Sequence, residues 1–201
     1  PMVLLGAAML WFGWFGFNAG SSLAADGIAV NALMTTHLAA ASALLVWSVC
    51  ELVTGNRPSA TGLAIGAVVG LVGVTPAAGF VDSLGAIAIG GLSSISAFVA
   101  MHYLKKVTLD DALDVFACHG VGGIVGSLLT GVFASTAVNP AGADGLLYGN
   151  PSQMWPQLTS VVAAGLLAAV GTWVILKVLE LTIGIRVAPN DELSLDQALH
   201  E

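Results

Sequence analysis

The chain has 201 residues, of which 57% are hydrophobic and only 8% are charged, and its mean hydropathy is +0.92. A soluble domain typically has about 25% charged residues, so this composition excludes an ordinary water-soluble fold and predicts that lipid surrounds most of the chain. The net charge of −7 argues against nucleic acid as a partner, because phosphate contacts need clustered Lys and Arg.

Apolar runs predict six membrane-spanning helices, because one crossing needs about 20 apolar residues. We place these spans at residues 2–19, 27–53, 58–75, 84–104, 111–134 and 151–185. The expected fold class is therefore an all-α integral membrane domain over residues 1–186, followed by a polar, acidic tail at 187–201. Because the chain is apolar from its first residue, Pro1, we expect that residue 1 is not the natural start.

Two of the predicted spans begin with a proline signal. Pro58 is expected in the first turn of the third span, where its missing N–H costs least. The sequence Asn150-Pro151-Ser152 marks the start of the sixth span. The sixth span is too long for a perpendicular crossing, so we expect it to tilt or to project from the membrane.

The five basic residues predict the orientation of the chain. The loops that follow the first, third and fifth spans contain no Lys or Arg. All the basic residues therefore fall on one side, which the positive-inside rule makes cytoplasmic: Arg57, Lys105, Lys106, Lys177 and Arg186. Both ends of the chain are then expected in the cytoplasm, and the long loop at residues 135–150 outside.

The first span ends in an unusually dense aromatic run, WFGWFGFN, at residues 11–18. Trp14 and Phe17 are three residues apart, so a helix places them one above the other on one face. Together with Ser21, this pair can hold a cation over aromatic faces while a hydroxyl accepts a hydrogen bond. The other tryptophans near span ends are typical of the membrane interface.

Histidines inside predicted spans are candidate functional groups. His119 lies past the first turn of the fifth span, and a histidine in a membrane usually faces a cavity or a partner. We interpret His119 as functional rather than as a packing residue. His37, in the second span, is interpreted instead as a packed, hydrogen-bonded side chain. His102 and His200 are expected on the cytoplasmic side and without a role.

No residue pattern predicts a metal site, a cofactor or an enzyme. Cys50 and Cys118 lie in apolar runs and are expected to be small buried hydrophobic residues. There is no pairing of a nucleophile with a base and no phosphate-binding loop. Glycines spaced by four residues, such as Gly122 and Gly126, predict close helix packing within the bundle.

Three motifs together resemble the ammonium transporter/Rhesus family, and its bacterial and archaeal ammonium transporters in particular. They are WFGWFGFNAGS at residues 11–21, GLVGVTPAAG at 70–79 and DVFACHGVGGIVG at 114–126. Members of this family have eleven spans in two inverted halves. The resemblance implies that this chain corresponds to spans six to eleven, with the N-terminal half supplied by the same or a separate chain.

The resemblance also implies roles for single residues. Phe17 corresponds to one of two stacked phenylalanines that gate the pore from outside, and Trp14 lies close to that gate. Ser21 corresponds to the serine of the outer ammonium-recruitment site. His119 corresponds to one of two pore histidines that share a hydrogen bond, and Asp114 to an acidic residue near the cytoplasmic end of the same helix.

Further expectations from the resemblance concern partners and location. They are transport of ammonium or ammonia, a homotrimer, an inner or plasma membrane location, and a PII-type regulatory protein at the cytoplasmic tail. The tail departs from the family's usual glycine-leucine-aspartate run. An ammonium sensor with the same fold, a Rhesus-like gas channel, and a half that is inactive without its complement remain as alternatives.

Overall fold

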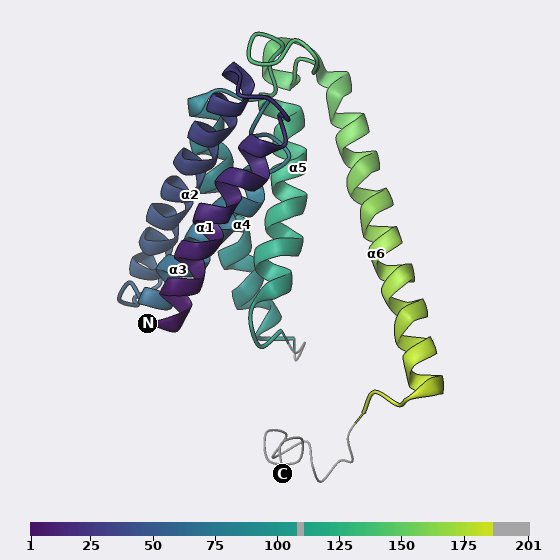
Figure 1. The fold of residues 1–201 in the computed structure, drawn as a ribbon. Helices are drawn as coiled ribbons and strands as arrows, with labels where there is room; N and C mark the ends of the chain where they lie inside the picture. Colours follow the sequence, from purple (N-terminus) through teal and green to yellow (C-terminus); the bar gives the residue numbers. More distant parts are fainter. Residues whose placement is uncertain (108–110, 187–201) are drawn as a thin grey trace. The chain divides into compact units, whose positions relative to one another are not determined.

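The fold is all-helical across the residues that the computed structural model describes, 1–107 and 111–186 (Figure 1). The long helices are α1 (Met2–Gly20), α2 (Gly27–Val53), α3 (Ala60–Val74), α4 (Ser83–Leu104), α5 (Gly122–Phe133) and α6 (Met154–Thr182). A π-helix, η1 (Phe116–Val121), runs directly into α5, and two short 3-10 helices, η2 (Leu146–Tyr148) and η3 (Pro151–Gln153), precede α6.

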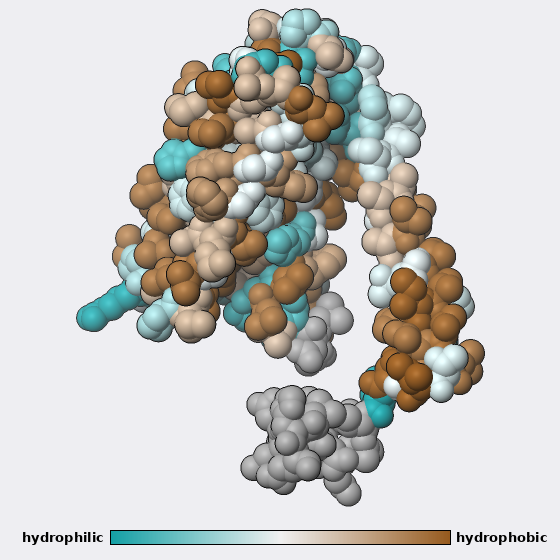
Figure 2. All heavy atoms as spheres, in the orientation of Figure 1, coloured by the Kyte–Doolittle hydropathy of each residue, from teal (hydrophilic) through white to brown (hydrophobic). Residues whose placement is uncertain are grey.

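The predicted spans reappear as apolar helices. Five helical segments are long and apolar enough to cross a membrane, and α3, with 15 residues, is shorter. Large apolar side chains also remain exposed along the helices, as the brown surface in Figure 2 shows. Outward-facing apolar residues are what a lipid environment requires, so the all-α membrane fold is confirmed.

The chain divides into two compact units, residues 1–159 and 160–201, with the boundary inside α6. In the first unit, α2 packs against both α3 and α4, and α1 packs against α2 and α3. Two buried apolar clusters fill this bundle, one around Ile89 and Val74 and the other around Trp47 and Phe98. In the second unit, the part of α6 beyond residue 159 buries no residue.

Glycines allow the helices of the first unit to approach each other closely. A Cβ atom on Gly126 of α5 would overlap the backbone of Gly73 of α3, and one on Gly90 of α4 would overlap Ala39 of α2. Such contacts are how helices associate in lipid, where the hydrophobic effect does not drive them together. The predicted packing role of Gly126 is therefore confirmed.

Side-chain caps fix where several helices begin. Asp26 accepts a hydrogen bond from the backbone N–H of Ala29 at the start of α2, at 2.8 Å. This bond lowers the pKa of Asp26, and a hydrogen bond from the Ser22 hydroxyl lowers it further. Asp82 accepts from the N–H of Gly85 at 2.7 Å and caps α4 in the same way. Such caps satisfy N–H groups that have no partner inside the helix.

Two predicted helix starts were wrong by a few residues. Pro58 lies outside α3, because Ser59 is the N-cap and accepts from the N–H of Gly62 at 2.9 Å. Glu51 in turn accepts hydrogen bonds from the backbone N–H and the hydroxyl of Ser59. The fifth span begins not at Asp111 but with the π-helix at Phe116, since the chain first makes a tight turn around Asp111.

Candidate functional site

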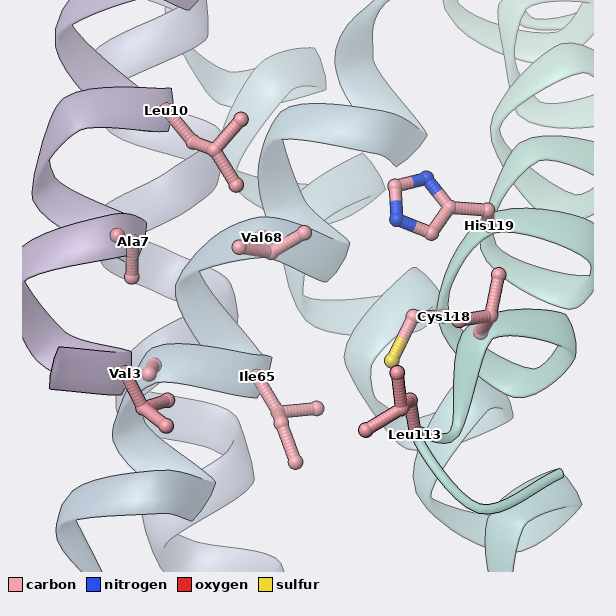
Figure 3. Close-up of a pocket in the computed structure, with 11 residues that line it drawn as sticks. Val3, Ala7, Leu10, Ile65, Val68, Leu113, Cys118 and His119 are labelled. Atoms are coloured by element: carbon pink, nitrogen blue, oxygen red, sulfur yellow. The ribbon is translucent and has the colours of Figure 1, made fainter. Parts of the chain in front are cut away.

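His119 lies in the middle of the π-helix, and its ring projects away from the helix. In Figure 3 the imidazole points into the space that Leu10 of α1 and Val68 of α3 also face. This space is a cavity of about 260 Å³, which Cys118 and Leu113 also line. His119 is exposed and lines this space.

His119 also lines a second cavity. It has a volume of about 300 Å³ and is lined by Trp14, Thr75 and Ser127 in addition to His119. Its walls come from α1, α5 and the C-terminal end of α3. His119 thus lines two hollows at once, and its functional role stays a prediction.

A hydrogen bond from Trp14 to the end of α3 orients the indole ring. Its Nε1–H donates to the hydroxyl oxygen of Thr75 at 2.8 Å, and that hydroxyl donates to the carbonyl of Leu71 at 2.7 Å. The Trp14 ring meets Phe17 edge to face, with ring centroids 6.0 Å apart. The predicted aromatic pair is therefore formed.

Beyond this pair lies a third hollow, more polar than the other two. It has a volume of about 390 Å³, and its lining includes Phe17, Ser21, Asp26, Thr75 and Asn139. The Phe17 side chain is 59% exposed at this point. The Ser21 hydroxyl donates to the carbonyl of Phe17 at 2.5 Å, which leaves its oxygen lone pairs available as acceptors.

The three hollows share lining residues and therefore form a series. Thr75 borders both the polar hollow and the cavity beside Trp14. His119 borders that cavity and the apolar one next to Leu113. The three hollows are therefore neighbours, from Ser21 past Trp14 and His119 to Leu113.

Asp114 occupies a different setting from the other predicted site residues. Its backbone is left-handed, with φ at 54°, just before the π-helix. Its carboxylate lies 3.7 Å from the ammonium group of Lys105. The residues on both sides of it, Leu113 and Val115, line the apolar cavity, whereas Asp114 does not.

The other histidines lie away from this series of hollows. His37 is exposed on α2, and its ring contacts Trp11 and Phe15, with centroids 5.4 and 6.2 Å away. Within the described residues it makes no hydrogen bond, so the predicted ring packing is present and the predicted hydrogen bond is absent. His102 bonds through Nδ1 to the Phe98 carbonyl at 2.9 Å. His200 and the tail lie outside the described residues.

Two residues of this region were missed at the sequence level. Thr75 holds Trp14, although its place inside the motif at residues 70–79 already marked this stretch as special. Asp111 accepts hydrogen bonds from the first N–H groups of the His119 helix. Among the described residues, no group of three or more His, Cys, Asp or Glu side chains can hold a metal ion.

Known proteins resemble this chain over its whole length. An Ammonium Transporter Family model matches residues 1–201. The ammonium transporter of Aquifex aeolicus is 49% identical over 201 residues, which cover 100% of this chain and 47% of that protein. Ammonium transporter Amt1 of Archaeoglobus fulgidus is 44% identical, over 100% of this chain and 51% of that protein.

Solved structures agree with the sequence comparisons. Saccharomyces cerevisiae Mep2 superimposes with a TM-score of 0.89 at 35% identity, over 96% of this chain and 45% of that one. A protein named "Sensor Amt Protein" gives a TM-score of 0.85 at 30% identity, over 98% of this chain and 48% of that one. The chain thus spans about half the length of the relatives it matches. With its membrane helices and this match over all 201 residues, the chain belongs to the ammonium transporter family.

Proposed function

We propose that the protein carrying this chain moves ammonium or ammonia across the membrane, along the hollows that run past Trp14 and His119. The observation that carries the proposal is the place of His119 at the junction of two cavities in the apolar bundle. The curated relatives are named as ammonium transporters and not as enzymes, and these names support the same substrate.

Recruitment takes place in the outer, polar hollow. An ammonium ion there meets the exposed ring of Phe17 and the lone pairs of the Ser21 hydroxyl. Aromatic faces attract cations, and a hydroxyl oxygen accepts an N–H hydrogen bond. Trp14, fixed by Thr75, forms the edge of the gate between this hollow and the next.

Selectivity follows from the cost of dehydration. Ammonium and potassium are similar in charge and size, but only ammonium can release a proton. Moving a charge from water into an apolar passage costs several kcal/mol even after relaxation, about the magnitude seen for buried ions. Desolvation also lowers the pKa of an amine, so the neutral form is favoured beyond the gate. Potassium has no neutral form and stays outside.

His119 then receives the nitrogen species in the passage. A neutral imidazole has one donor and one acceptor nitrogen, so it can bond to ammonia and relay a proton. Asp114 is proposed as an acid of the cytoplasmic vestibule, next to Lys105. A second pore histidine and the second gate phenylalanine belong to the complementary half, on the same or a separate chain.

The setting of this activity is proposed from the same evidence. The absence of Lys and Arg from the loops at residues 21–26, 75–82 and 134–150 supports an outward position for them and a cytoplasmic C-terminus. We propose an inner or plasma membrane location, a homotrimer, and contact of a PII-type regulator with the tail at residues 187–201.

Removal of the imidazole tests the pore. In the full-length protein reconstituted in liposomes, His119→Ala should reduce ammonium flux roughly tenfold or more, or lose the exclusion of potassium, because a positioned imidazole is what transfers protons efficiently. His102→Ala is the matched control, since His102 bonds only to its own helix. Unchanged flux and unchanged potassium exclusion in His119→Ala would disprove the role.

The similarity to a protein named "Sensor Amt Protein" favours one second candidate, an ammonium sensor with the same fold. A sensor would bind ammonium in the outer hollow without net flux. The same liposome assay separates the two, because a sensor shows ammonium-dependent quenching of Trp14 fluorescence while the internal ammonium concentration stays constant.

A further inference from the structure

The helix that carries His119 is wound differently from the rest of the bundle. Residues Phe116–Val121 form a π-helix, in which hydrogen bonds span five residues instead of four, and the α-helical pattern resumes at Gly122. One residue turns an α-helix by about 100°, so one extra residue in a turn changes the direction of the side chains before it by about that angle. The direction of His119 therefore depends on this wide turn.

A single carboxylate, that of Asp111, holds the start of the wide turn. Its Oδ1 accepts from the backbone N–H of Val115 at 2.9 Å, and its Oδ2 accepts from Phe116 at 3.0 Å and from Ala117 at 3.4 Å. These N–H groups belong to the first turn of the helix, which has no partners for them of its own. Both oxygens are therefore used to cap one turn.

The backbone between the cap and the turn is constrained as well. The N–H of Asp114 donates to the carbonyl of Asp111 at 2.9 Å, and the carbonyl of Asp114 accepts from Cys118 at 3.0 Å. The left-handed φ of 54° at Asp114 lets the chain fold back so that the Asp111 side chain reaches the helix end. Such a conformation is uncommon outside glycine and persists only where its surroundings hold it.

We propose that Asp111 is a positioning residue for the pore, because its three hydrogen bonds fix the π-helical turn that aims His119 into the two cavities. The inference rests on the proposed function of His119. Asp111 does not line either cavity that His119 borders, so it acts through the helix rather than on the substrate.

This proposal differs from a general capping role in what it predicts. A cap that only stabilises its helix changes the amount of folded protein, whereas a positioning residue changes the flux of each folded molecule. The outer hollow is built by α1, the start of α2, the end of α3 and the outer loops, none of which contains Asp111, so the half-saturating ammonium concentration should stay the same when Asp111 is changed. Only the maximal flux should fall.

The experiment measures flux per folded molecule in liposomes made with the full-length protein. Asp111→Ala should lower the maximal flux on the order of tenfold, since small misplacements of a reacting group have large effects. Asp111→Asn, which keeps one acceptor oxygen, should fall between Ala and wild type, and it carries the test if Asp111→Ala does not fold. Asp82→Ala is the matched control, because it removes a comparable cap from α4 and should leave the flux per molecule unchanged.

A double variant decides whether Asp111 acts through the imidazole. If it does, adding Asp111→Ala to His119→Ala should cause no further loss, because coupled residues are not additive. A further tenfold loss in the double variant, or unchanged flux in Asp111→Ala and Asp111→Asn alike, would overturn the positioning role. A His119→Ala protein with unchanged flux and potassium exclusion would instead disprove the proposed function itself, whatever Asp111 does.

Discussion

At the scale of single residues, the hydroxyl of Thr75 connects Trp14, part of the proposed gate, to the bundle. It accepts a hydrogen bond from the indole N–H of Trp14 and donates one to the carbonyl of Leu71. One side chain therefore connects α1 to the end of α3. Trp14 in turn supports Phe17 through an edge-to-face contact. The shape of the proposed gate thus depends on a residue outside the aromatic pair itself.

Removing that hydroxyl should loosen the gate. Thr75→Val keeps the shape of the side chain but leaves the Trp14 N–H without its acceptor, and a lost hydrogen bond costs about 1 kcal/mol. We expect the half-saturating ammonium concentration to rise roughly two- to tenfold in liposome flux assays. Thr159→Val is the control, because that hydroxyl bonds only to its own helix. The same half-saturating ammonium concentration in Thr75→Val and Thr159→Val would contradict this role.

At the scale of helices, α3 and α5 meet backbone to backbone at a pair of glycines. Gly73 and Gly126 bring the two backbones together next to the cavity that His119 borders. The hydroxyl of Ser93 also lies against Gly73, buried and without a hydrogen-bond partner among the described residues. This junction has no room for any added atom, and it fixes the distance between α5 and α3.

A methyl group at this junction should therefore force the helices apart. Gly126→Ala is expected to destabilise the bundle by about 1–3 kcal/mol, the usual cost of overpacking, in spite of the better helix propensity of alanine. The melting temperature of the detergent-solubilised protein measures this effect. Gly165→Ala is the matched control, because a Cβ there meets no atom within 4 Å and should be neutral or stabilising. An unchanged melting temperature for Gly126→Ala would contradict this prediction, because it would show that α3 and α5 can accommodate the methyl group.

At the scale of the whole first unit, the loops that lack basic residues lie together around the polar hollow. Three loops line the polar hollow: the loop before α2, the loop before α4 and the loop after α5. They contribute Ser22, Gly79 and Asn139, respectively. The backbone N–H of Ser135 also donates to the carbonyl of Phe80, at 2.8 Å. None of these three loops contains Lys or Arg.

This arrangement predicts how a membrane-impermeant thiol reagent should react with single cysteines. With Cys50 and Cys118 replaced by serine, Ala137→Cys should be labelled from outside intact cells, because Ala137 is exposed in the loop after α5. Lys106→Cys should be labelled only after the membrane is opened, because basic loops stay in the cytoplasm. Labelling of Lys106→Cys in intact cells, with Ala137→Cys protected, would reverse the proposed orientation.

Much of this fold could be predicted from the sequence, because apolar runs report membrane spans directly. The pairing of Trp14 with Phe17 was also predictable, since helical spacing fixes it. The π-helix around His119 was not, because one extra residue in a turn leaves the hydropathy of the run unchanged. The cap at Asp111 and the acceptor at Thr75 depend on contacts that only the folded chain brings together.

The orientation of two hydroxyl groups determines which solutes can form hydrogen bonds with them in the polar hollow where we propose recruitment. Ser21 and Thr75 both direct their protons to helix carbonyls, of Phe17 and Leu71, so towards the hollow they offer only lone pairs. Anions and solutes that carry only acceptor atoms therefore find no partner in these two groups. A molecule gains hydrogen bonds from them only if it brings its own N–H or O–H groups, and few small solutes carry as many N–H groups as ammonium.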